Sequence, residues 1–399
     1  MRNQKSVKKS LFDRWTRYFK YALQTKHAMK HIYVAATSQH VGKTTTTLGL
    51  VANLKGRGFN TGYCKPVGQK SIAWDGLVAD KDAVLFSEVI GFKIDPDIHS
   101  PVVLGRGVTK EFIEDSSRYH FEEKLLRARD VLESTYDVVV YEGTGHPGVG
   151  SVVNLSNARV AKMLSAGTIM VVEGGIGSTI DMLNMCTSLF REEQVPVLGV
   201  IVNKVKPEKM EEVEYYLSRK LRDLDLPLLG ILPYDNTLSL PILETVRQAI
   251  DGKVVFNEEY MNNRVEDIIA GSLVEVDEFR IFENILLVTS MNRLKEAVTK
   301  VESVAKIKRG GHCPLSGVIV TSDGKHERWF DPADLYNPYL MQHKVPVITT
   351  TLDTFGSVVK ISRIEVKINN RTPWKSMRAI DLIGQYVNFD AIMDRFHLR

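Results

Sequence analysis

Short apolar segments alternate with longer amphipathic ones from residue 29 to about residue 245. The apolar segments are hydrophobic almost throughout, which is typical of parallel strands that helices bury on both faces. The expected strands are residues 31–36, 61–67, 137–141, 168–172, 195–202 and 228–233. Between them hydrophobic residues recur at helical spacing, for example in residues 121–132, 158–164 and 210–221. The pattern predicts an α/β domain built on a doubly wound parallel sheet.

The alternation of expected strands and helices is interrupted around residues 251–257, and a second series of elements follows. Strands are expected near residues 285–289, 316–321 and 345–349, and helices at 294–305, around 331–341 and at 374–387. This series predicts a second, smaller α/β domain without a glycine-rich phosphate loop. The expected parts are an extension at 1–28, the first domain at 29–245, a linker at 246–258 and the second domain at 259–399.

Composition is that of an ordinary globular protein, with 399 residues, 44% of them hydrophobic and 25% charged. No apolar run approaches the ~20 residues that cross a bilayer. Cys64, Cys186 and Cys313 lie far apart and form neither a metal-binding nor a disulfide spacing. These features favour a protein of the reducing cytoplasm.

Positive charge is concentrated in the N-terminal extension. Residues 1–28 contain eight Lys or Arg and one Asp, so they carry +7 and the rest of the +4 chain carries −3. That remainder has no broad basic surface for nucleic acid. The hydrophobic residues of the extension fall on one helical face, which indicates a basic amphipathic helix. We favour a helix that packs on its own protein or on a partner, although contact with a membrane or a presequence stays open.

A phosphate-binding loop is the clearest chemical feature of the sequence. The expected strand 31–36 leads into a loop that ends in Gly42 and Lys43, and a helical segment follows. Amides at a helix start and the positive end of its dipole attract phosphates. In such loops the lysine reaches the β- and γ-phosphates and the next hydroxyl binds Mg²⁺. The residues expected to surround a nucleotide here are Thr37, Ser38, Gln39, His40, Val41, Gly42, Lys43, Thr44 and Thr45.

Polar residues follow other expected strands, where open parallel sheets bind ligands. Glu142 follows the strand 137–141 and suits a second anchor for Mg²⁺, although a surface or capping glutamate is the alternative. Lys65 lies near the end of the expected strand 61–67, directly before Pro66, and can bind an anionic substrate or balance charge on a transferring phosphoryl group, unless it is a surface lysine before a turn. Asp80 and Asp82 begin a helical run and could simply cap it. Asn203 can contact a base or form a turn.

In this order, these residues resemble the dethiobiotin synthetase branch of the phosphate-loop proteins. That branch includes cobyrinate-type amide synthetases and the N-terminal regions of long phosphate acetyltransferases. The matching segments are residues 36–44, with Thr37 in place of a glycine, and residues 63–67, 82–85, 142–145 and 202–204.

The resemblance implies a Mg·ATP site and a homodimer. It implies that Thr44, Asp82 and Glu142 hold Mg²⁺. It also implies that Lys43 and Lys65 act beside the phosphates and that Asn203 contacts adenine. Residues 146–155 are closer to cobyric acid synthase than to dethiobiotin synthetase. None of the cysteines has the glycine-flanked setting of a glutaminase nucleophile, so a self-sufficient amidotransferase is excluded.

The second domain resembles the DRTGG domain that follows the same phosphate-loop unit in long phosphate acetyltransferases. Residues 291–293 stand at its Asp-Arg motif, and residues 321–324 stand at its Thr-Gly-Gly motif. We expect a Mg·ATP-binding regulatory protein whose second domain senses a small ligand or a partner. The alternative is an ATP-dependent enzyme that phosphorylates a carboxylate or carbamate, a small anionic ligand held near Lys65.

Overall fold

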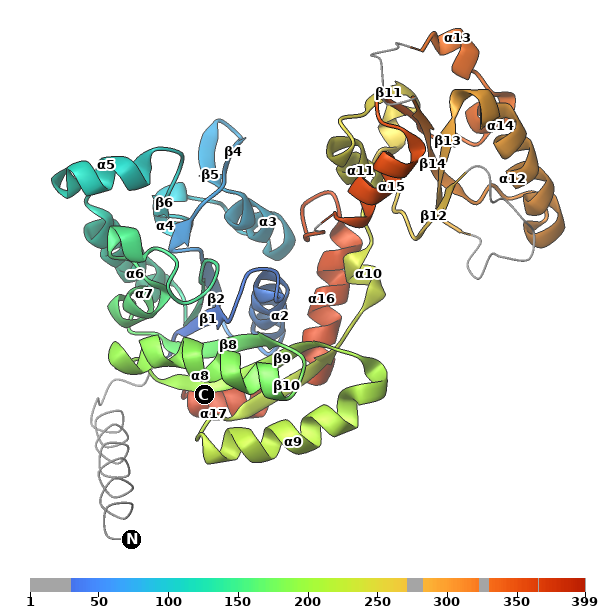
Figure 1. Cartoon of the computed structure of the whole chain (residues 1–399). Helices are drawn as coiled ribbons and strands as arrows, with labels where there is room; N and C mark the ends of the chain where they lie inside the picture. Colours follow the sequence, from blue (N-terminus) through green and yellow to red (C-terminus); the bar gives the residue numbers. More distant parts are fainter. Residues whose placement is uncertain (1–29, 271–282, 323–329, 365, 399) are drawn as a thin grey trace. The chain divides into compact units, whose positions relative to one another are not determined.

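The structure is a computed structural model that describes residues 30–270, 283–322, 330–364 and 366–398 (Figure 1). The expected amphipathic helix of residues 1–28 lies outside the described residues. The chain forms two compact units. The first runs to Asp235 and resumes at Pro373, and the second spans Asn236–Thr372.

Among the described residues, six parallel strands form the central sheet of the first unit, in the order β10-β9-β8-β1-β7-β2. Side chains of β1 alternate between its two faces, with Tyr33 on one and Val34 on the other, because strand periodicity is two. The strands are β1 (Ile32–Ala36), β2 (Thr61–Cys64), β7 (Val138–Glu142), β8 (Gly167–Glu173), β9 (Val197–Val205) and β10 (Leu228–Pro233).

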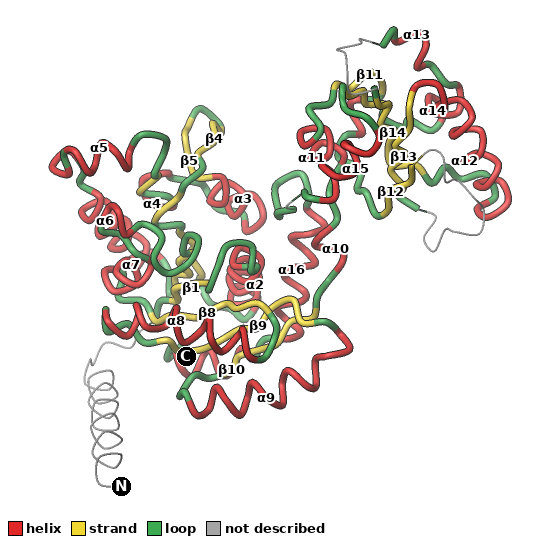
Figure 2. The backbone as a smooth tube through the Cα atoms, viewed as in Figure 1, coloured by secondary structure: helices red, strands yellow, loops and turns green. Residues whose placement is uncertain are grey.

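Helices cover both faces of this sheet, so the strands lie between helices in Figure 2. One face carries α6 (Phe121–Thr135), α7 (Asn157–Met163), α8 (Gly177–Glu192) and α9 (Met210–Asp223). The other carries α2 (Lys43–Gly56), α3 (Lys81–Ile90), α16 (Pro373–Tyr386) and α17 (Phe389–Arg395). The predicted doubly wound parallel sheet is confirmed.

The expected strand 61–67 ends early. β2 stops at Cys64, where the amide of Lys65 turns away and donates to the carbonyl of His99 at 2.8 Å. The chain then forms short elements before it returns to the sheet. They are β3 (Val67–Gly68), the hairpin of β4 (Ser71–Trp74) and β5 (Leu77–Asp80), α4 (Pro96–His99), β6 (Val102–Val103) and α5 (Val108–Glu114). This departure carries the side chain of Lys65 over the carboxyl edge of the sheet.

The C-terminal segment differs from the expected domain boundary, which placed residues 259–399 together. Helices α16 and α17 belong to the first unit instead. Glycines allow α16 to approach α2 closely, since a Cβ added at Gly49 would lie 2.3 Å from Cβ of Ile383. Asn53 also donates to the carbonyl of Ile380 at 3.0 Å. The amphipathic pattern showed that this helix buries a face but did not show against what.

Among its described residues, the second unit holds a five-stranded sheet in the order β11-β15-β14-β13-β12. Its strands are parallel except for β11 at one edge. The expected linker 246–258 instead contains β11 and the end of α11. The elements are α10 (Asn236–Ser239), α11 (Leu243–Ala249), β11 (Lys253–Phe256), β12 (Asp267–Ala270), β13 (Ile285–Ser290), α12 (Leu294–Arg309), β14 (Leu315–Thr321), α13 (Pro332–Leu335), α14 (Pro338–Gln342), β15 (Val347–Thr350) and α15 (Thr354–Ser362).

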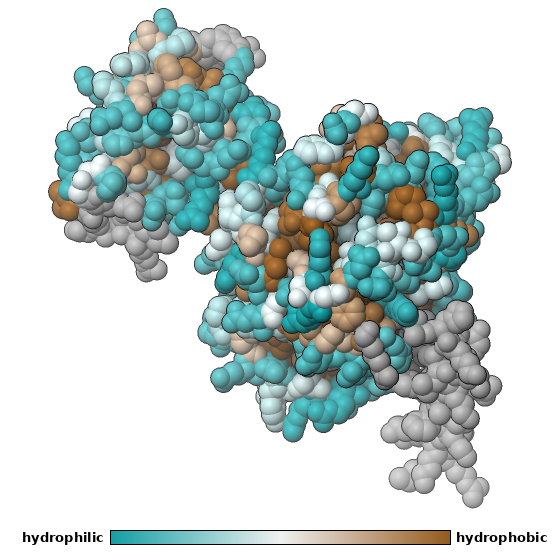
Figure 3. All heavy atoms as spheres, turned by 180° about the vertical axis from the view of Figure 1, so that it is seen from behind, coloured by the Kyte–Doolittle hydropathy of each residue, from teal (hydrophilic) through white to brown (hydrophobic). Residues whose placement is uncertain are grey.

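The surface is mixed in polarity. On the face drawn in Figure 3, hydrophobic side chains gather in limited patches among hydrophilic ones. Within the described ranges, no helix is both long enough and apolar enough to cross a membrane.

Candidate functional site

The phosphate-loop segment lies between β1 and α2, at the carboxyl edge of the first sheet. Thr37 is buried, and its amide extends the ladder by donating to the carbonyl of Val171 at 3.0 Å. Thr37 is not among the residues with positive φ, so this position tolerates a side chain where related loops have glycine.

A conformational constraint and a steric constraint both favour glycine at position 42, at the start of α2. Its φ of 101° lies in the left-handed region, and a Cβ there would come 2.0 Å from Nδ2 of Asn203. Glycine has no side chain that could cap the first turn of the helix. The geometry explains why glycine stands at this position.

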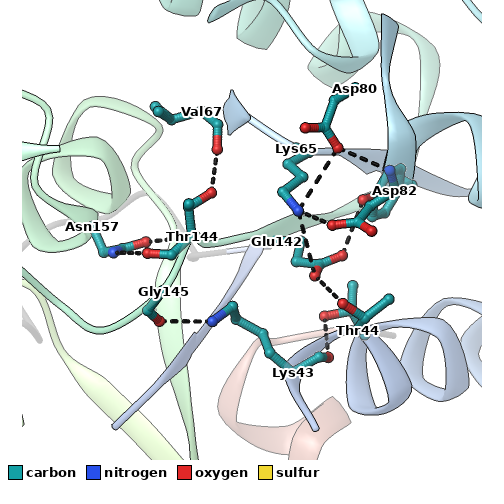
Figure 4. Close-up of polar contacts among 12 residues, drawn as sticks. Lys43, Thr44, Lys65, Val67, Asp80, Asp82, Glu142, Thr144, Gly145 and Asn157 are labelled. Atoms are coloured by element: carbon teal, nitrogen blue, oxygen red, sulfur yellow. Dashed lines mark hydrogen bonds and ion pairs between the residues drawn. The ribbon is translucent and has the colours of Figure 1, made fainter. Parts of the chain in front are cut away.

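Lys43 reaches across the loop that follows β7. Its Nζ donates to the carbonyl oxygen of Gly145 at 2.7 Å (Figure 4). The next residue, Thr44, donates from Oγ1 to Oε1 of Glu142 at 2.7 Å. The predicted loop residues and the predicted acidic strand end therefore lie together.

Glu142 is the last residue of β7 and is 1% exposed. Its Oε1 faces Thr44, and its Oε2 accepts a hydrogen bond of 3.0 Å from the hydroxyl of Tyr63. Burial raises the pKa of the Tyr63 phenol well above its usual value, and the charge of Glu142 adds to this rise. Tyr63 therefore stays a neutral donor that fixes one oxygen of the carboxylate and leaves the other facing the helix.

The side chain of Lys65 lies beside that of Glu142. Its ammonium contacts the carboxylate of Asp82 directly and lies 3.7 Å from Oδ1 of Asp80 and 4.0 Å from Oε1 of Glu142 (Figure 4). Asp80 also caps α3, because its Oδ1 accepts the amide of Asp82 at 2.9 Å. The contacts of Lys65 thus bring Asp82 and Glu142, which are far apart in sequence, to one place.

Sequence reasoning missed Asn157, which builds the loop opposite Lys43. Its Oδ1 accepts from the Tyr33 hydroxyl at 2.8 Å and from the Thr144 amide at 2.9 Å. Its Nδ2 donates to the carbonyls of Thr144 at 2.8 Å and His146 at 2.7 Å. These four bonds use the full capacity of the amide group. No spacing rule identifies this residue, since its partners come from β1 and from the loop after β7.

Asn203 lies against the phosphate-loop segment. Its Nδ2 donates to the carbonyl of Val41 at 2.8 Å, and its Oδ1 accepts the amide of Lys204 at 2.8 Å. The expected strand 195–202 runs further, because β9 continues through Val205. In the structure Asn203 supports the loop, and its expected contact with adenine stays a prediction.

A family model described as an AAA domain matches residues 30–241, which is more than half of the chain. The chain belongs to the AAA-domain family. The loop, Glu142, Lys65 and Asn157 all lie within this AAA domain.

The relatives of this AAA-domain chain include longer proteins. The phosphate acetyltransferase of Nitrosomonas europaea is 24% identical over 390 residues, which cover 92% of this chain and 52% of that protein. The phosphate acetyltransferase of Pseudomonas putida is 29% identical over 308 residues, or 74% of this chain and 42% of that protein. A probable cobyric acid synthase of Methanococcus vannielii is 27% identical over 259 residues, or 57% and 50%. The chain spans about half the length of the curated relatives it matches.

Among solved structures, the MinC:MinD cell division protein complex of Aquifex aeolicus gives a TM-score of 0.35 at 16% identity, covering 52% of this chain and 83% of that one. A likeness at this score carries no functional argument. The matched model and the strand–loop–helix geometry give the AAA domain a fold like that of phosphate-loop NTPases.

The oxygen atoms around Glu142 fit Mg²⁺. The hydroxyl of Thr44 and the carboxylates of Asp82 and Glu142 are hard oxygen ligands, which this ion prefers. The ammonium of Lys65 already places a positive charge among the carboxylates. Among the described residues, no group of three or more His, Cys, Asp or Glu could hold a metal ion, so the protein would supply two carboxylates and one hydroxyl. Mg²⁺ commonly keeps several waters and takes phosphate oxygens as further ligands.

Proposed function

We propose that the AAA domain binds ATP with Mg²⁺ and that the chain is a nucleotide-dependent regulatory or sensing protein. The observation that carries binding is the start of α2. There Gly42 leaves the first turn uncapped, Lys43 follows it, and the hydroxyl of Thr44 meets the buried carboxylate of Glu142 at 2.7 Å. This helix start lacks a capping side chain, carries a lysine and lies beside a hydroxyl and a carboxylate that could bind a metal ion, which we call the metal-type oxygens. Together these features favour a nucleoside triphosphate over a simple anion.

The roles of the chain's own residues follow from their positions. The amides of the first turn of α2 would bind phosphate oxygens, and Lys43 would leave the carbonyl of Gly145 for the β- and γ-phosphates. Thr44, Asp82 and Glu142 would hold Mg²⁺, which neutralises phosphate charge when bound. Asn203 would contact adenine, as the resemblance implies.

The second unit supports a sensing role. It builds hydrophobic cores on both faces of its own sheet, so it does not depend on the first unit for a core. The resemblance implies that it corresponds to the DRTGG domain of long phosphate acetyltransferases, and a DRTGG-like ligand site is part of the proposal. Of the matching motif, Asp323 and Gly324 lie outside the described residues. The expected homodimer and cytoplasmic location remain predictions.

Calorimetry with ATP and Mg²⁺ tests the binding site. Wild type should bind one ATP per chain, and Lys43→Ala should lose at least about 100-fold in affinity, because the cation closest to the transferred phosphates is removed. Lys55→Ala is the matched control, since Lys55 lies on the same helix and its Nζ donates to the carbonyl of Ile90. Equal affinity in Lys43→Ala and wild type would reject the site.

The alternative is an ATP-dependent enzyme that phosphorylates a carboxylate or carbamate. The relatives named cobyric acid synthase favour it. The charge around Lys65 opposes it, because three carboxylates already surround the ammonium that would hold an anionic substrate. Phosphate release should be measured with candidate carboxylates and amines. Fast release that Lys65→Ala lowers far more than it lowers ATP affinity would replace the regulatory proposal with the enzymatic one.

A further inference from the structure

Lys65 has more negative partners than a phosphate-binding lysine needs. Its ammonium, which is largely buried, contacts Asp82 and lies within 4.0 Å of both Asp80 and Glu142. We call these four residues the Lys65 cluster. Three carboxylates and one ammonium give the cluster a formal charge of −2, which a single divalent cation would neutralise.

The carboxylates of the cluster are not equally free to change partner. The side chain of Asp80 is 3% exposed and is held by its capping bond to the amide of Asp82 and by close packing on Gly68, where an added Cβ would lie 2.3 Å from Oδ2. The side chain of Asp82 is 26% exposed and lies in the first turn of α3. Asp82 can therefore be reached from solvent, whereas Asp80 is fixed.

We propose that Lys65 is an exchangeable counter-ion and that Asp80 is its positioning residue. In the metal-free protein the ammonium balances Asp82 and Glu142. When a divalent cation binds, Lys65 gives up these two carboxylates and keeps Asp80. The inference rests on the proposed Mg·ATP function, and it differs from the expected role of Lys65 as a direct ligand of an anionic substrate. It predicts that Lys65 and the metal compete for the same oxygens.

Two variants distinguish competition between Lys65 and the metal ion from an effect of the net charge of the Lys65 cluster on metal binding. Lys65→Met removes the ammonium and leaves the cluster at −3, so both effects would tighten metal binding. Lys65→Met combined with Asp80→Asn removes one charge of each sign and keeps the cluster at −2. A net-charge effect then predicts no change, whereas competition predicts tighter binding. Asparagine also caps helices, so the amide of Asp82 keeps an acceptor in the double variant.

The experiment is a Mn²⁺ titration of the full chain without nucleotide, with free Mn²⁺ measured by electron paramagnetic resonance. The double variant should bind Mn²⁺ at least about tenfold more tightly than wild type, because a unit charge within 4 Å acts strongly at a buried site. Asp80→Asn alone should weaken binding several-fold, because Lys65 then holds Asp82 and Glu142 more strongly. Lys70→Met is the control, since Lys70 is exposed nearby, and it should stay within about twofold of wild type.

Each outcome decides the inference. Equal or weaker Mn²⁺ binding in the double variant would overturn it and leave Lys65 as a static ion pair. If Lys65→Met folds only with Mn²⁺, as followed by thermal unfolding, the inference is supported, because the metal then replaces the missing ammonium. The proposed function is tested separately by ATP titration of wild type. Absent ATP binding would reject that function, whereas the nucleotide-free titration judges the exchange by itself.

Discussion

Helix α2 of the AAA domain and helix α15 of the second unit each follow the carboxyl end of a parallel strand, and their first turns are built in opposite ways. Helix α2 follows β1 in the AAA domain and begins after Gly42, which has no side chain to cap it. Helix α15 follows β15 in the second unit and begins after Asp353, whose Oδ1 accepts the amide of Gly356 at 2.6 Å. The residue before the helix thus provides no capping side chain in the AAA domain and provides one in the second unit.

The polar groups beside the two helix starts also differ in whether they pair with each other or with a buried carboxylate. Beside α2, the hydroxyl of Thr44 meets the buried carboxylate of Glu142. Beside α15, the hydroxyls of Thr321 and Thr354 bond to each other at 2.9 Å, and the amide of Ser322 donates to Leu352. An aspartate at a helix start already complements the dipole and repels a phosphate. Both units provide a sheet edge, and under the proposed function the phosphates bind where the helix start lacks a capping side chain and a hydroxyl and a carboxylate lie beside it.

The largest expected effect on ATP binding comes from closing the open helix start. Gly42→Ala should lower ATP affinity by about 100-fold or more, because the left-handed backbone resists a side chain and the new methyl group collides with Asn203. Gly58→Ala is the matched control, since Gly58 also has positive φ but has nothing within 4 Å of an added Cβ. It should cost about 1 kcal/mol of stability and leave ATP affinity unchanged. Calorimetry and urea unfolding measure both, and wild-type ATP affinity in Gly42→Ala would contradict the comparison.

The next effect concerns the metal-type oxygens. Thr44→Val removes the hydroxyl with little change in shape and should lower ATP affinity about tenfold with Mg²⁺ but hardly at all with a chelator, because only the metal contact is lost. Thr47→Val is the control, since that hydroxyl bonds within α2 to the carbonyl of Lys43. The same loss in affinity with and without Mg²⁺ would show that Thr44 serves the loop and not the metal.

A smaller effect on ATP is expected from the loop opposite Lys43. Asn157→Leu removes four hydrogen bonds, three of them buried and one partly buried, and should destabilise the AAA domain by about 3 kcal/mol, with a several-fold loss of ATP affinity through the displaced carbonyl of Gly145. Tyr33→Phe removes one of those bonds and should cost about 1 kcal/mol. Urea unfolding gives the stabilities. Equal losses in the two variants would mean that the amide of Asn157 does not hold the loop.

Substitutions at the helix start of the second unit should leave ATP binding unchanged. Asp353→Ala removes the cap of α15 and should cost about 1 kcal/mol of stability, while Asp353→Asn keeps an acceptor and should cost less. Neither should change the affinity or the stoichiometry of ATP measured by calorimetry. A second ATP bound per chain in Asp353→Ala would break the comparison, because a helix start alone would then suffice.

The sequence by itself determined the first sheet, its loop and the edge expected for Glu142 and Lys65, whereas the place of Asp82 was implied only by the resemblance. These features are local, since a strand buried on both faces is apolar throughout and a phosphate loop is a continuous segment. The shared edge follows because parallel strands end on the same side. The contacts of Thr44 with Glu142 and of Lys65 with Asp82 agree with that reasoning.

Only the tertiary structure decided which distant groups pair. It joined α16 and α17 to the first unit, because Gly49 admits Ile383 and an amphipathic pattern names a buried face but not its partner. It brought Asn157 to the loop after β7 and Asp80 to Lys65. A polar residue that follows an apolar strand can meet solvent, a ligand or another side chain, and nothing in its spacing distinguishes these. Burial and hydrogen-bond geometry distinguish them, and both arise only when segments far apart in the chain pack together.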